Sequence, residues 1–209
     1  MRIAFFISGL LALAMAWLGP LPELAGVAFC GHMLMHMLVV AVAAPLMSLA
    51  LADSRYDPSE RHPWFWAPIP ASIGELILVW AWHAPGLHHL ARSETLGLVA
   101  EQGSFLLAGL WLWLSAFGGG AIRGGRRGAA GVVGLWLTSM HMTLLGALLA
   151  LAPRSVYAHH TGFGSLSPLQ DQHLGGAVMI LVGGIAYLSG GLWLTVGLLR
   201  QHSDQEAPT

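Results

Sequence analysis

Long stretches without a charged side chain dominate this sequence. They cover residues 3–22, 24–52, 102–122, 128–153 and 172–199, and residues 63–91 are interrupted only by Glu75. A helix needs about 20 apolar residues to cross the hydrocarbon core of a bilayer, so each stretch is long enough for a membrane span. Charged residues make up only 9% of the chain. The sequence therefore excludes an ordinary water-soluble domain.

We predict an all-α fold, a polytopic transmembrane helical bundle with six spans in one domain over residues 1–209. The expected spans are residues 3–19, 24–50, 69–84, 95–117, 130–152 and 173–199, and residues 201–209 form a short tail. The first segment also fits a signal peptide, because Arg2 precedes an apolar run and Ala12-Leu13-Ala14 is a small-x-small cleavage pattern. Its removal would leave five spans.

The arginines predict the orientation of the bundle. With the N-terminus inside, seven arginines face the cytoplasm, namely Arg2, Arg55, Arg61, Arg123, Arg126, Arg127 and Arg200, and Arg92 and Arg154 face outward. This asymmetry follows the positive-inside rule, so we expect both termini in the cytoplasm of a bacterial inner membrane. The formal net charge of −1 provides no basic surface for nucleic acid.

Histidine is the unusually frequent polar residue. The chain has 11 histidines, and in this orientation nine of them lie in a span or on the outer side. An ionisable side chain inside a bilayer is costly, so it is by default a functional hypothesis. The single cysteine, Cys30, is expected to be a buried thiol and excludes a thiolate cluster. Metal chemistry therefore falls to histidine, methionine and carboxylate.

The motif over residues 30–37, Cys-Gly-His-Met-Leu-Met-His-Met, is the strongest candidate metal site. His32 and His36 are four residues apart, so both imidazoles project from one helix face, and Met33 and Met37 form a second such pair. Imidazole and thioether donors favour copper, especially Cu(I). His141, between two methionines, is expected to supply a third nitrogen if the second and fifth spans pack together.

Further candidates lie toward the predicted outer side. They are His83 and His173 as ligands, and Asp171, Glu101, His159 and His160 as supporting or metal-capturing groups. Other interpretations stay open: His83 fits an interfacial residue, Asp171 a helix cap, and Glu101 a protonated carboxyl. We expect residues 85–94 to be a connection in which His88 and His89 are solvated. Glu75 is expected to reach the cytoplasmic interface.

These motifs resemble the CtaG-like cytochrome c oxidase assembly factors, polytopic membrane proteins implicated in furnishing copper to haem–copper oxidases. Three blocks carry the resemblance: residues 31–38 with 43–47, residues 80–85 with 105–113, and residues 167–176 with Met179. His141 and the following Tyr157 belong to the same pattern. The family pattern often has a histidine before the Ser-Phe of the fourth span, where this chain has Glu101-Gln-Gly-Ser-Phe105.

The resemblance implies a non-enzymatic assembly factor with an oxidase subunit as its partner. Copper would be captured by the outer histidines and Asp171, pass to His32 and His36 with a methionine or His141, and then leave to the oxidase. Two other functions remain open. One is a bis-histidine haem electron carrier with His36 and His141 as axial ligands, and the other is a copper transporter.

Overall fold

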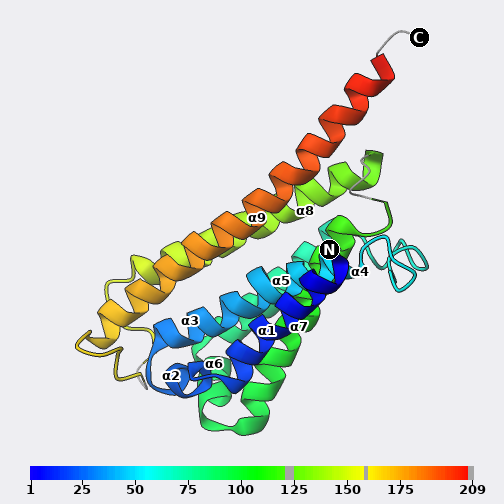
Figure 1. The fold of residues 1–209 in the computed structure, drawn as a ribbon. Helices are drawn as coiled ribbons and strands as arrows, with labels where there is room; N and C mark the ends of the chain where they lie inside the picture. Colours follow the sequence, from blue (N-terminus) through cyan, green and yellow to red (C-terminus); the bar gives the residue numbers. More distant parts are fainter. Residues whose placement is uncertain (121–124, 158–159, 207–209) are drawn as a thin grey trace.

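The computed structural model of the protein describes residues 1–120, 125–157 and 160–206 (Figure 1). Every regular element in these residues is helical, which confirms the all-α prediction. In chain order the helices are α1 (Arg2–Leu18), α2 (Leu21–Val27), α3 (Phe29–Met37), the π-helix η1 (Leu38–Ala43), α4 (Ala44–Leu51), α5 (Pro68–His83), α6 (Pro85–Ser93), α7 (Thr95–Phe117), α8 (Gly125–Ala150) and α9 (Pro168–Glu206).

Four helices of the described chain are long and apolar enough to cross a membrane. They are the continuous unit Phe29–Leu51, then α7, α8 and the Pro168–Gln201 part of α9. α1 and α2 are bent by 45° at their junction and form a fifth candidate if they are counted as one span. α5 corresponds to the expected span 69–84, but it has only 16 residues. The count of six spans is therefore not confirmed.

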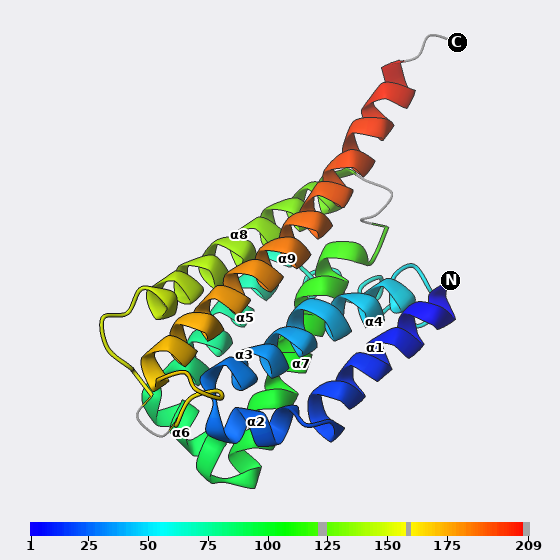
Figure 2. The same cartoon turned by 60° about the vertical axis from the view of Figure 1, so that its left-hand side comes forward.

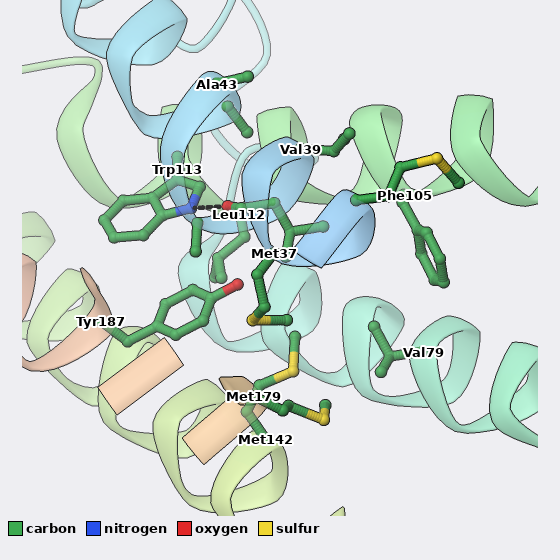
Figure 3. Close-up of a cluster of buried hydrophobic side chains, with 14 of the residues drawn as sticks. Met37, Val39, Ala43, Val79, Phe105, Leu112, Trp113, Met142, Met179 and Tyr187 are labelled. Atoms are coloured by element: carbon green, nitrogen blue, oxygen red, sulfur yellow. Dashed lines mark hydrogen bonds between the residues drawn. The ribbon is translucent and has the colours of Figure 1, made fainter. Parts of the chain in front are cut away.

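The second expected span, 24–50, is wrong as a single helix. Ala28 has an extended backbone and separates α2 from α3. The continuous unit then widens into η1 just before Pro45, which has no N–H to donate to a carbonyl one turn earlier. Trp113 of α7 donates a hydrogen bond of 2.9 Å to the carbonyl of Val40 inside η1 (Figure 3).

Two further boundaries differ from the sequence expectation. The predicted connection 85–94 contains α6, a short helix that begins at Pro85. The last helix begins at Pro168 rather than at residue 173. Proline is common in the first turn of a helix because its fixed φ suits that position, and both helices use it there.

Glycines let α9 pack closely against its neighbours. A Cβ on Gly176 would lie 2.6 Å from the backbone of both Gly146 and Ala150 in α8. A Cβ on Gly175 would lie 2.5 Å from the ring of Phe29 in α3. α9 therefore packs against both α8 and α3, and Figure 2 shows it running between them. Small residues at such contacts are typical of membrane helix pairs.

The outer surface of the bundle is apolar. On α9, the large aliphatic side chains Leu181, Ile185, Leu188 and Leu192 are exposed at helical spacing. α8 exposes Met140, Leu144 and Leu148 in the same way. Such stripes are costly in water and favourable in lipid. They support a multi-pass membrane protein.

Candidate metal centre

The face of α3 that carries His32 and His36 points into the bundle. Both side chains are fully buried, and their rings stack at an interplanar angle of 7° with centres 6.2 Å apart. The prediction that the two imidazoles share one helix face is confirmed. Neither ring has a hydrogen-bond partner for its nitrogens among the described residues. Buried polar atoms normally find partners, so this pair is a candidate for a ligand.

His83, at the end of α5, faces the same pair. Its Nδ1 donates a hydrogen bond of 2.6 Å to the carbonyl of Val79, one turn earlier. A carbonyl only accepts, so the proton of a neutral His83 ring lies on Nδ1 and the lone pair lies on Nε2. This is the arrangement that orients histidine ligands in metal sites. The structure buries His83 rather than leaving it at an interface.

His83 lies at the spacing of a metal site from both His32 and His36, whose own ring centres are farther apart, at 6.2 Å. The ring centre of His83 lies 5.4 Å from that of His32 and 5.5 Å from that of His36. With metal–nitrogen bonds of about 2.0 Å, three imidazoles around one ion have ring centres about 5.2 to 5.5 Å apart. We call these three residues the inner trio.

A second set of donors shares His32. The ligand atoms of His32, His88 and Glu101 all lie within 4.8 Å of one another, and all three residues are buried. We call these residues the outer trio. The inner trio does not meet this distance criterion, so its rings must rotate before their nitrogens point at one ion. The expectation that His88 is solvated is wrong, because α6 turns it inward, whereas His89 is exposed.

Arg92 and Glu101 form a buried ion pair beside His32. The guanidinium of Arg92 contacts Glu101 Oε2, and the same oxygen lies 3.7 Å from His32 Nδ1. Gln102 also donates to this oxygen, while Glu101 Oε1 has no hydrogen-bond partner among the described residues. One positive and one negative side chain leave the site with no net formal charge when the imidazoles are neutral. Adding a monovalent cation costs less here than adding a divalent one.

His160 and Tyr157 cover the outer trio from the segment that precedes α9. The Nε2 atoms of His160 and His88 lie 2.9 Å apart, at hydrogen-bond distance. Tyr157 stacks on Phe29 with ring centres 4.6 Å apart, and its hydroxyl donates to the carbonyl of His83. Burial raises the pKa of Tyr157, so the hydroxyl keeps its proton and remains a donor. His159, predicted with them, lies outside the described residues.

His141 does not join this cluster. It is buried in α8, and no ring contact links it to another histidine in the described part of the chain. The condition on which His141 would supply a third nitrogen is not met, because α9 packs against both α3 and α8 and His141 lies away from the pair. Among the described residues, the other histidine rings beside the pair are those of His83 and His88.

The motif that opens α9 has a structural role. Asp171 accepts hydrogen bonds from the backbone N–H groups of Phe29 and Cys30 at 2.6 and 3.3 Å, so it caps α3 rather than its own helix. His173 donates a hydrogen bond of 2.9 Å from Nε2 to the carbonyl of Ala152. Cys30 is buried, as expected. Residues 171–173 thus hold the cluster's helices in place.

The two methionines of the motif turn away from its histidines. A Cβ on Gly175 of α9 would lie 3.0 Å from Met33 Cγ, and a Cβ on Gly183 would lie 3.9 Å from Met37 Sδ. Met33 and Met37 therefore pack along α9, on the face of α3 rotated by about 100° from that of the histidines.

Glu75 does not reach an interface. It is fully buried between helices, and Tyr187 of α9 donates a hydrogen bond of 3.0 Å to its Oε1. Ser72 and Thr138, also buried, share a hydrogen bond of 2.8 Å between α5 and α8. The expectation for Glu75 is wrong because the face of α5 that carries it packs against the longer helices α7 and α8.

Sequence reasoning missed His88 and Arg92 as parts of the site. A signal was available: Pro85 marks a helix start, and residues 88 and 92 are then four apart on one face. The segment was too short and too polar to be considered with the membrane spans. Its position over the histidines arises only from tertiary packing.

One known protein family matches a stretch of the chain that contains every histidine of the cluster. A family model described as "Cytochrome c oxidase caa3 assembly factor (Caa3_CtaG)" matches residues 1–201. The matched range includes all the residues of both trios. No curated protein and no solved structure matches the chain.

Proposed function

The chain belongs to the cytochrome c oxidase caa3 assembly factor family, and we propose that it serves assembly by holding a copper ion for the oxidase. Copper is cargo in this proposal, bound and released without catalysis. The proposed partner is a membrane subunit of a haem–copper oxidase. We further propose six spans, with the histidine cluster toward the outer side of a bacterial inner membrane.

The observation that carries the proposal is the set of buried nitrogens without protein partners. Both nitrogens of His32 and His36 and Nε2 of His83 have no hydrogen-bond partner among the described residues. Leaving such groups unsatisfied in an apolar interior costs about 1–3 kcal/mol each. A metal ion satisfies several of them at once. Imidazole is a good copper ligand, and the charge-neutral site favours the monovalent ion.

The two overlapping trios suggest how the ion moves. His88 comes from α6 and His160 from the segment before α9, whereas His36 lies one turn after His32 on α3 and His83 ends α5. An ion held by the outer trio reaches the inner trio by exchanging His88 and Glu101 for His36 and His83, while His32 stays bound. Sequential exchange of ligands keeps the ion coordinated throughout and permits release to a partner.

The test is the copper content of His32→Ala/His36→Ala, measured by elemental analysis after anaerobic purification in detergent. We expect the double variant to bind at least tenfold less copper at limiting concentration, because both trios lose a ligand. His141→Ala is the matched control, a buried membrane histidine outside the cluster, and it should retain wild-type copper. Unchanged copper in the double variant would overturn the proposal, as would a Soret band with no copper in the wild type.

A further inference from the structure

We propose that Met37, Met142 and Met179 form a second Cu(I) site made only of thioethers, separate from the histidine cluster. The three side chains come from α3, α8 and α9, and each is at most 1% exposed. The proposal rests on the proposed copper-binding function, because it adds a second holding position for the same ion.

The geometry at Gly183 brings these side chains together. A Cβ built on Gly183 would lie 3.9 Å from Met37 Sδ and 3.8 Å from Met142 Cβ, so both methionines border the same point on α9. Met179 is one turn earlier on that face of α9. Figure 3 shows the three side chains grouped between their helices.

The register of α9 against α3 explains this convergence. Gly175 lies against Phe29 and Met33, and Gly183 lies against Met37, so positions 175 and 183 leave room for the larger α3 side chains. Met179, between the two glycines, is the one long side chain on that stretch of the α9 face. It is thereby placed beside the methionines of α3, where Met142 closes the group from α8.

The chemistry of this group suits a soft monovalent ion. Thioether sulfur carries no proton and no charge, and it selects Cu(I) over ions that prefer oxygen ligands. Methionine also fills gaps in apolar cores without binding anything, so packing alone is the competing explanation. The two explanations differ in whether copper has sulfur neighbours.

The site has a defined place relative to the histidines. Met37 follows His36 directly and points about 100° away around α3. An ion leaving the inner trio can therefore reach Met37 by moving about 100° around a single helix. The thioether site would hold copper on the α9 side of α3, while the histidines hold it on the side of α5 and α7.

The test is X-ray absorption at the copper edge, on full-length protein loaded anaerobically with Cu(I). At excess Cu(I), above the limiting concentration at which this variant loses its copper, we expect His32→Ala/His36→Ala to bind copper whose nearest neighbours are sulfur only. Met37→Leu/Met142→Leu/Met179→Leu should lose the sulfur signal and keep the nitrogen signal. Met15→Leu/Met140→Leu is the matched control, because these methionines are exposed on the outer surface, and it should keep both signals.

Several outcomes separate this inference from the function on which it rests. Loss of all copper from the histidine variant overturns the thioether site but leaves the histidine site intact. Retention of the sulfur signal in the triple leucine variant also overturns it. Absence of copper from every variant and from the wild type overturns both proposals. Should the triple variant misfold, wild-type protein labelled with selenomethionine must show copper–selenium scattering, and its absence overturns the site.

Discussion

The carboxylate of Asp171 accepts a hydrogen bond of 2.6 Å from the backbone N–H of Phe29, across 142 positions of the sequence. Asp171, near the start of α9, thus caps α3, the helix that carries His32 and His36. A carboxylate at a helix N-terminus satisfies free N–H groups and complements the helix dipole. The contact fixes the start of α3 relative to α9, and with it the positions of both histidines.

We expect Asp171→Ala to lower the free energy of unfolding by about 0.5–2 kcal/mol, the usual cost of losing a helix cap. Thermal unfolding in detergent, followed by circular dichroism, measures the loss. Glu94→Ala is the control: Glu94 precedes α7 but makes no side-chain cap. Equal effects of the two substitutions would show that the cap does not stabilise the bundle.

The pair of Arg92 and Glu101 is expected to behave as a unit. Glu101→Gln alone leaves the buried guanidinium without its counter-charge, which costs about 3–5 kcal/mol. The double variant Arg92→Met/Glu101→Gln should recover much of this loss, because no uncompensated charge remains. A thermodynamic cycle from unfolding midpoints gives the coupling energy. Additive effects of the two single substitutions would mean that the pair is not coupled.

Gly176 is expected to tolerate no side chain. A methyl group there would lie 2.6 Å from the α8 backbone, so Gly176→Ala should destabilise the protein by about 1–3 kcal/mol, as overpacking does. Gly184→Ala serves as the comparison, since nothing lies within 4 Å of its Cβ position. That substitution should leave the melting temperature unchanged or raise it slightly, because alanine favours helices. A similar fall for both variants would contradict the close α8–α9 contact.

Asp57 is expected to make the stability of the segment between α4 and α5 depend on pH. Burial raises the pKa of Asp57, but hydrogen bonds from Ser59, Gly119 and Asp53 outweigh it and hold the pKa below its usual 3.8. The unfolded chain therefore binds the proton more readily. The stabilisation is full above that value and is lost as the pH falls through the folded pKa.

Asp57→Asn tests this dependence. At pH 7 the variant should be less stable by about 1–3 kcal/mol, because an amide cannot accept all these hydrogen bonds. The difference in melting temperature between wild type and variant should shrink as the pH is lowered below about 4, where the native carboxylate also becomes protonated. A difference in melting temperature that stays constant from pH 7 to pH 3 would show that the Asp57 carboxylate is not the source of the pH dependence.

Much of the architecture could be predicted from local sequence. The charge-free stretches predicted an all-helical chain, and the spacing of His32 and His36 predicted that both rings share one face. These features depend on residues close in sequence, whose relative positions follow from the helix repeat. The short segments were harder. α2 and α6 are only seven and nine residues long, so hydropathy over a span could not separate them from their surroundings.

The sequence by itself determined the helical class, family membership and the histidine pair, because each depends on composition, motifs or a single helical period. Only the tertiary structure decided which residues meet that pair. Glycines let α9 pack against both α3 and α8, which takes Met33 and Met37 to the α9 side and leaves His141 apart. α5 and α6 supply His83, His88 and Arg92 instead. Which side chains contact the histidine pair depends on how closely helices distant in sequence approach one another, and the periodicity of a single helix does not encode that.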